Sequence, residues 1–68
     1  MTVDTFSAVV QEKIRFIQDR IVFVEQWASQ AGVDRAAKEL LIRPYRQLLD
    51  ELYEHDLPLA RLADRSAT

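Results

Sequence analysis

The sequence predicts an all-α fold: an antiparallel helical hairpin that pairs with a second chain to form a four-helix bundle. Three observations lead to this prediction. Apolar residues make up 49% of the 68 residues, with one glycine and two prolines, which is typical of packed helices. Apolar positions recur at helical spacing on both sides of a single turn signal. The apolar surface of each helix is also wider than one neighbouring helix can cover.

The length allows a single domain, residues 1–68. At this size one helical core gives little stability unless something reinforces it. The chain has no cysteine, so disulfides are excluded, and its one histidine, His55, cannot complete the usual thiolate and imidazole metal sites. We therefore expect no metal and no cofactor, and we expect oligomerisation to supply the missing stability.

The first helix is predicted from about residue 3 to residue 31. Thr2 or Asp4 can cap its start by accepting hydrogen bonds from free backbone amides, and Gly32 can end it in the left-handed conformation. Along this helix apolar residues recur at alternating steps of four and three, the coiled-coil pattern. This main seam consists of Val10, Ile14, Ile17, Ile21, Val24, Ala28 and Ala31.

The second helix is predicted from about residue 35 to residue 55, with Asp34 as its N-cap. So short a connection makes the two helices antiparallel neighbours. Pro44 lacks an amide proton and crowds the carbonyl four residues earlier, so we expect a kink near residue 44. The alternative is two shorter helices with Pro44 in the first turn of the second. The expected main face is Ala37, Leu41, Tyr45, Leu48 and Leu52, with Leu40 beside it.

The remaining residues, 57–68, form a tail. Leu57-Pro58 is expected to end the second helix, and the residues after it form a short C-terminal turn or helix. Whether residues 58–64 are helical is left open by the sequence. Residues 65–68 are small and polar and are expected to fray.

A second apolar stripe runs beside the main seam of the first helix, and the two together span about 160°, whereas one neighbouring helix covers roughly 100°. Leaving its aromatic side chains in water would forgo on the order of 10 kcal/mol. The stripe consists of Val9, Phe16 and Phe23, with Phe6 and Trp27 adjacent. In the second helix the apolar arc is widened by Ile42, Leu49 and Tyr53.

These stripes predict a homodimer. The alternative is a monomeric three-helix unit in which the tail folds back over the extra stripe. The residues expected at the assembly interface are Val10, Ile14, Phe16, Ile17, Ile21, Phe23, Val24, Trp27, Leu49 and Tyr53.

No residue constellation indicates an active site. Glu51 and His55 have i, i+4 spacing, which an ordinary solvated helix end explains. Lys13 and Arg20 border the apolar arc, where they can lie beside the aromatics, pair with carboxylates across a dimer interface or bind an anionic ligand. Four i, i+4 pairs of opposite charge are expected to stabilise exposed faces. They are Arg15–Asp19, Arg35–Glu39, Glu39–Arg43 and Arg46–Asp50.

The formal charge of −2 is small and both signs are interspersed, so neither nucleic acid nor a membrane is favoured as a partner. The longest apolar run, residues 21–24, is too short to cross a bilayer, and no secretory signal is apparent, so we expect a cytoplasmic protein. The sequence predicts a non-enzymatic protein-interaction module that self-associates and docks onto or regulates a partner protein. The alternatives are a nucleic-acid-binding regulator of the hairpin-dimer type and a small helical-bundle enzyme acting on an anionic substrate.

Overall fold

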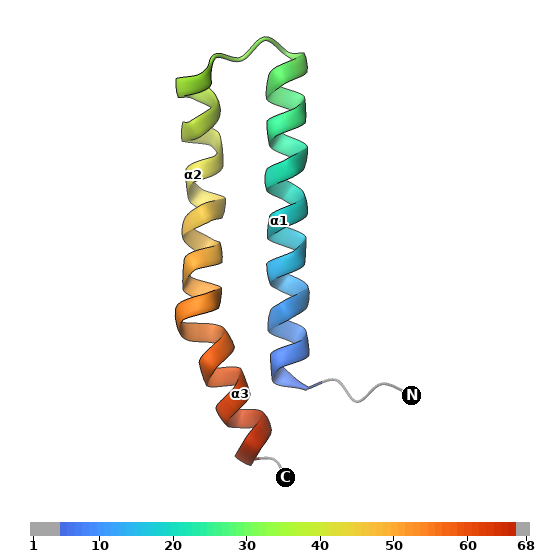
Figure 1. Ribbon diagram of the computed structural model, residues 1–68, viewed down its shortest axis with the longest axis vertical. Helices are drawn as coiled ribbons and strands as arrows, with labels where there is room; N and C mark the ends of the chain where they lie inside the picture. Colours follow the sequence, from blue (N-terminus) through green and yellow to red (C-terminus); the bar gives the residue numbers. More distant parts are fainter. Residues whose placement is uncertain (1–4, 67–68) are drawn as a thin grey trace, which may run out of the picture.

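The chain folds into two helical arms joined by a short turn (Figure 1). A computed structural model describes residues 5–66, and the regular structure within that range is helical. One arm is α1 (Phe6–Gln30). The other arm consists of α2 (Arg35–Glu51), a π-helical turn (Leu52–Asp56) and α3 (Leu57–Ser66), which follow one another without a break. The predicted all-helical hairpin is confirmed.

The turn between the arms forms as the sequence indicates. Gly32 takes the left-handed conformation, with φ of 73°. The amide of Val33 donates to the carbonyl of Ala28 at 2.9 Å, the bond that closes a glycine-terminated helix end. Asp34 then accepts a hydrogen bond from the amide of Ala37 at 2.8 Å and caps α2. The chain is thus reversed within a few residues, and both predicted turn signals are confirmed.

The start of α1 is capped by Thr5, whose side chain accepts a hydrogen bond from the amide of Ala8 at 3.1 Å. This bond satisfies one of the amides that a helix start leaves free. The predicted start near residue 3 and the predicted caps Thr2 and Asp4 lie outside the described residues.

Asp64 of α3 closes the open end of the hairpin. Its Oδ1 accepts from the amide of Phe6 at 2.7 Å, and its Oδ2 accepts from the amide of Ser7 at 3.0 Å and from the Ser7 hydroxyl at 2.6 Å. The carboxylate thereby meets the positive end of the α1 dipole. The Ser7 hydroxyl, followed by the backbone amides, lowers the pKa of Asp64 and outweighs the opposing effect of desolvation.

Pro44 does not divide the second arm, because α2 runs through it as one α-helix. The alternative of two shorter helices is therefore wrong. Pro44 has no amide proton to donate to the Leu40 carbonyl, and both residues are exposed.

Pro58 does not end the second arm either, which corrects the expected helix end at Leu57-Pro58. The amide of Leu57 donates to the carbonyl of Leu52, five residues earlier, which is π-helical spacing. This wider turn accommodates the proline ring, and Pro58 then lies in the first turn of α3, where its missing amide is not needed. Residues 58–64 are therefore helical, as are residues 65 and 66, while residues 67 and 68 lie outside the described range.

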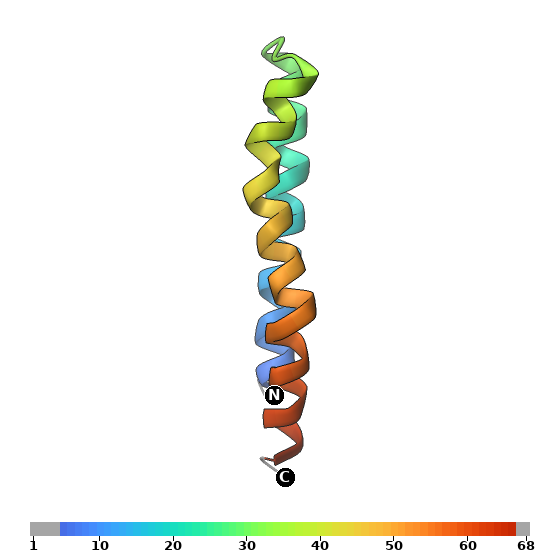
Figure 2. The same ribbon diagram turned by 90° about the vertical axis from the view of Figure 1, so that its left-hand side faces the viewer.

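The hairpin is one helix thick. Its extents are 51 × 26 × 8 Å, and the two arms overlap in a single line when the molecule is turned by 90° (Figure 2). The radius of gyration is 15.5 Å, whereas a compact domain of this length has about 11 Å. The chain exposes 5607 Å², against about 4400 Å² for a compact protein of 7.9 kDa. Each arm covers the other along one edge, and both broad faces stay open.

The core lies along the line between the arms. The residues of the second helix that it contains differ from the predicted face, which is therefore corrected. Leu41 and Leu48 are 44% and 45% exposed, whereas Ile42 is 1% exposed and Leu49 is half-buried. Counted from the turn, both arms then follow the same steps of four, three, four and three, so their side chains meet in layers. The seam, buried or half-buried throughout, is Ala28, Val24, Ile21, Ile17 and Ile14 on α1 and Lys38, Ile42, Tyr45, Leu49 and Leu52 on the second arm.

The surface ion pairs also differ from the prediction. Glu39 pairs with Arg46, seven residues along, with an N–O distance of 2.9 Å. Within residues 5–66 the four predicted i, i+4 pairs do not form. Because both partners are exposed, the Glu39–Arg46 pair contributes little to stability, about 1 kcal/mol at most.

Which face of α2 points toward α1 can be tested with two truncated side chains. Ile42→Ala is expected to lower the free energy of unfolding by about 2–5 kcal/mol, because it empties a fully buried position. Leu40→Ala removes an exposed side chain and should change it by about 0.5 kcal/mol or less. Urea unfolding at one fixed chain concentration measures both, and equal losses would contradict the observed face.

The role of Asp64 can be tested by Asp64→Asn, which should lower the urea midpoint at neutral pH. Folding lowers the pKa of this carboxyl, so its contribution is complete above the ordinary value of 3.8 and is lost as the pH falls through the lower folded-state value. The gap between the wild type and the variant should therefore close in acid. Asp50→Asn, which removes an exposed carboxylate of the same arm, is the control; a gap that persists at low pH would contradict the assignment.

Candidate interaction face

The two sides of the α1 seam carry different surfaces. At about 100° per residue, a residue directly before a seam position lies on one side of the helix and a residue directly after it on the other. The preceding residues are aromatic, aliphatic and basic: Val9, Lys13, Phe16, Arg20, Phe23 and Trp27. The following residues are polar except for one valine: Gln11, Arg15, Gln18, Val22, Glu25 and Ser29.

The second arm is divided in the same way. The residues that precede its seam positions are apolar except for one acid: Ala37, Leu41, Pro44, Leu48 and Glu51. The residues that follow are polar or charged apart from a tyrosine: Glu39, Arg43, Arg46, Asp50 and Tyr53.

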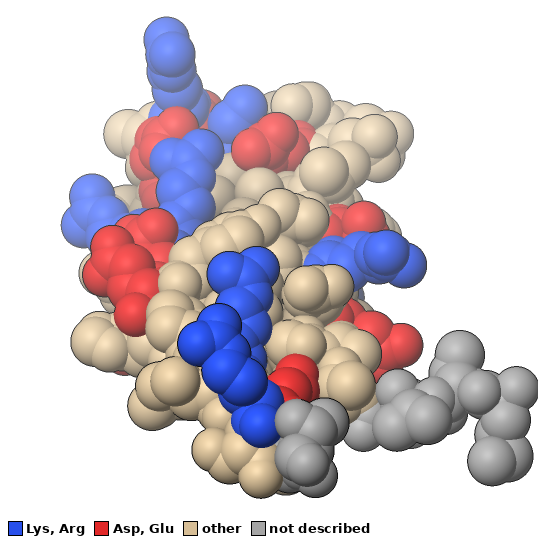
Figure 3. All heavy atoms as spheres, turned by 60° about the horizontal axis from the view of Figure 1, so that its bottom comes forward, with Lys and Arg blue, Asp and Glu red and all other residues tan. Residues whose placement is uncertain are grey.

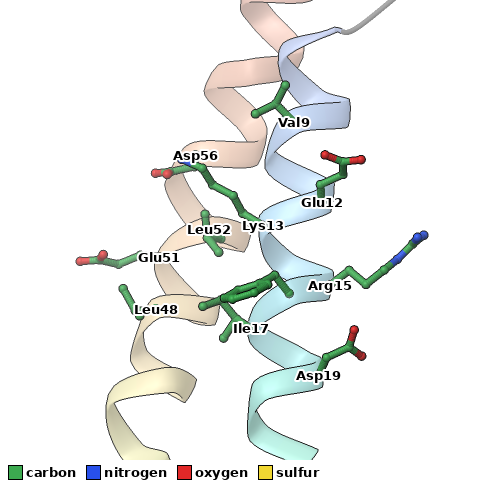
Figure 4. Close-up of a pocket in the computed structure, with 11 residues that line it drawn as sticks. Val9, Glu12, Lys13, Arg15, Ile17, Asp19, Leu48, Glu51, Leu52 and Asp56 are labelled. Carbon is green, nitrogen blue, oxygen red and sulfur yellow. The ribbon is translucent and has the colours of Figure 1, made fainter. Parts of the chain in front are cut away.

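The preceding residues of both arms share one broad face of the hairpin. A local two-fold axis perpendicular to the plane of two antiparallel helices exchanges one helix with the other. Rotation about this axis does not exchange the two sides of the plane, so equivalent residues of both helices lie on the same side. An open groove of about 790 Å³ bears this out, since Lys13 and Phe16 of α1 line it together with Leu48 and Glu51 of α2 (Figure 4). We call this surface the aromatic face: Val9, Lys13, Phe16, Arg20, Phe23, Trp27, Ala37, Leu41, Pro44, Leu48 and Glu51.

The following residues lie on the opposite face. Gln18 and Tyr53 show this directly, because the Gln18 Nε2 donates to the Tyr53 Oη at 3.3 Å across the two arms. Apart from Tyr53 and Val22 this face is polar. The hairpin therefore has one apolar broad face and one polar broad face.

The aromatic side chains of the aromatic face are exposed. Phe16, Phe23 and Trp27 are 67%, 58% and 51% exposed. The Arg20 guanidinium lies over the Phe23 ring, 5.6 Å from its centroid, a cation–π contact worth about 0.5–1 kcal/mol at an exposed site. One of the roles expected for Arg20, a cation beside an aromatic ring, is thus observed.

The tail leaves this face uncovered. α3 slants from the π-helical turn toward the start of α1 (Figure 1), which it contacts through Asp64 and through Leu57, a member of the core cluster with Ile14. Leu59 and Leu62, the side chains that could cover a stripe, are themselves exposed. Within the described residues the tail therefore does not fold back over the aromatic stripe, as the three-helix alternative expected.

The residues predicted for the assembly interface fall into three groups. Phe16, Phe23 and Trp27 lie on the aromatic face, while Tyr53 lies on the opposite face. The others lie within the hairpin seam or beside it, half-buried or buried: Val10, Ile14, Ile17, Ile21, Val24 and Leu49.

Sequence reasoning missed Leu41 and Leu48 as members of the aromatic face. It assigned them to the edge facing α1, because Leu41 and Leu48 lie directly beside Ile42 and Leu49 and both pairs fit the helical period. The alternating steps of four and three, continued from α1 through the turn, are the signal that would have identified Ile42 and Leu49 as the inward pair.

The groove of the aromatic face is open and carries both signs of charge. Lys13 extends across it toward Asp56 of the π-helical turn, and Glu12, Arg15 and Asp19 stand along its α1 side (Figure 4). Among the described residues, no three acidic or histidine side chains come close enough together to hold a metal ion. The groove thus offers an apolar floor with charged edges.

The remaining charges are distributed over the surface. Acidic and basic side chains are interspersed on the face that Figure 3 shows, with uncharged surface between them. Glu51 and His55 are both exposed, and the helix end expected there is not observed, because the second arm continues through the π-helical turn into α3. Within residues 5–66, none of the helices combines the length and the hydropathy that a membrane crossing requires.

Compared with models of protein families, with curated proteins and with solved structures, the chain shows no significant match.

Proposed function

We propose that this chain is a non-enzymatic interaction module that self-associates through the aromatic face into a four-helix bundle and presents its remaining surface to a partner protein. The observation that carries the proposal is the exposure of Phe16, Phe23 and Trp27 on one side of a hairpin only one helix thick. Aromatic side chains contribute most when they are fully covered, and a second flat hairpin is a surface of matching shape.

The solvent-exposed area of the chain supports this proposal. The chain exposes about 1200 Å² more than a compact protein of its mass, and a standard interface removes about 800 Å² from each partner. The buried core of one chain is small: within the described residues it consists of Ile14, Ala28, Ile42, Leu52, Leu57 and Ala60. Two of these are alanines, so a second layer would add much of the apolar burial that a stable fold needs.

Self-association needs no second gene product, because a two-fold axis lets one surface meet its own copy. The two alternative functions gain no comparable support. On the face that Figure 3 shows, acidic side chains stand among the basic ones, which does not favour nucleic acid there, and the open groove around Lys13 does not enclose a substrate.

The proposal predicts the mass in solution. Sedimentation at micromolar concentration should give about twice the chain mass of 7.9 kDa. Phe23→Glu should shift the chain to the monomer, because it places a charge within the aromatic face. Val22→Glu is the matched control, since Val22 is the next residue along, has a similar exposure of 52% and lies on the polar face. Dimers in both variants, or a monomeric wild type, would refute the proposal.

Trp27 provides a second test, because it is the one tryptophan of the chain. Its indole is half exposed in the single hairpin and would be covered in the bundle. On dilution the emission of the wild type should shift to longer wavelength at the concentration where the mass falls, whereas Phe23→Glu should emit at the longer wavelength throughout. An emission that does not change with concentration while the mass does would place Trp27 outside the interface.

A further inference from the structure

From the charge and side-chain size on the two halves of the aromatic face, we infer that the occupant of this face is a second copy whose turn lies at the same end, so that α1 of each copy lies on α2 of the other. This inference rests on the proposed self-association. It concerns the direction of the two-fold axis.

Two flat hairpins can meet face to face about two axes. An axis parallel to the long direction puts both turns at one end and sets α1 against the partner's α2. An axis across the hairpin puts the turns at opposite ends and sets α1 against the partner's α1. The two arrangements bring different halves of the aromatic face together, so the properties of those halves discriminate between them.

The charges of the two halves favour the parallel axis. At the positions directly before the seam, the α1 half carries Lys13 and Arg20, while the α2 half carries Glu51 and no base; Glu12 and Asp19 lie farther from the seam, along the α1 edge of the groove. A parallel axis sets the basic half on the acidic half. A crosswise axis sets two basic halves against each other, which is unfavourable where water is excluded.

The sizes of the side chains favour the same axis. The α1 half carries two phenylalanines and a tryptophan, whereas the α2 half carries Ala37, Leu41, Pro44 and Leu48. Large side chains set against smaller ones interdigitate at the density of a protein interior. A crosswise axis would place the bulky half against itself and leave the smaller half of each copy less completely filled.

The parallel axis also fixes the register without any adjustable shift. Rotation about the long axis does not change the position of a residue along that axis. Residues of α1 and α2 that lie at the same position along the axis within one hairpin therefore also lie at the same position in the two copies. Within the hairpin, equal numbers of residues counted from the turn place Val24 level with Ile42 and Ile17 level with Leu49. The residues just before these lie on the aromatic face within about 3 Å of the same level, at 1.5 Å per residue, which sets Phe23 near Leu41, Phe16 near Leu48 and Lys13 near Glu51 of the other copy.

The test measures distances between the two copies. The chain has no cysteine, so a single cysteine can carry a spin label at a chosen position. Gln30→Cys lies near the turn and Arg61→Cys near the open end, and both positions are exposed. Arg15→Cys, also exposed, lies near the middle of α1 at the outer edge of the groove, so its labels are close in either arrangement and it serves as the control.

Pulsed dipolar spectroscopy should find short distances for both end positions. With turns together, the Gln30 backbones lie on diagonal helices about 11–14 Å apart, given a spacing of about 8–10 Å between neighbours. With turns apart, they are separated by about 36 Å along the bundle, at 1.5 Å per residue. Long distances at Gln30 and Arg61 with a short one at Arg15 would overturn the inference and leave the dimer intact. Absence of dipolar coupling at all three positions, together with a monomeric mass, would refute self-association itself.

Discussion

The structure depends on one seam of side chains that runs along the facing edges of two helices. It is the single line along which each arm can cover the other, and its alternation of four and three steps sets the rotation of both helices at once. Because the chain has only two arms, burial along this line leaves the broad faces open. The flat shape, the small core and the exposed aromatics all follow from that geometry.

The two ends of the seam are held by different means. At the turn, a left-handed glycine and an aspartate cap bring the arms together through local hydrogen bonds. At the open end, Asp64 reaches the first turn of α1 from more than fifty residues away along the chain. The π-helical turn before Pro58 makes this contact possible, because it carries the second arm past a residue that would otherwise end it. Without α3, the amides of Phe6 and Ser7 would lose the carboxylate that accepts their hydrogen bonds.

The difference between the two broad faces connects the fold to the proposed function. Both faces consist of residues next to seam positions, yet the residues before them are mostly apolar and those after them are mostly polar. Folding of one chain alone does not require this asymmetry, since neither face is covered by the hairpin. A second layer on the aromatic face accounts for this asymmetry. The division of that face into a basic, bulky half and an acidic, smaller half favours one orientation of the second copy.

The sequence by itself determined the helices, the turn and the α1 seam, because their causes are local: apolar spacing, a glycine and an N-cap. It also identified Phe16, Phe23 and Trp27 as surplus apolar surface. Only the tertiary structure decided that Ile42 and Leu49 face inward in place of Leu41 and Leu48, since four apolar neighbours fit the helical period and packing against α1 selected among them. It likewise decided that the chain continues through Pro58 to Asp64, because a proline stops a helix locally unless a wider turn and a distant contact compensate.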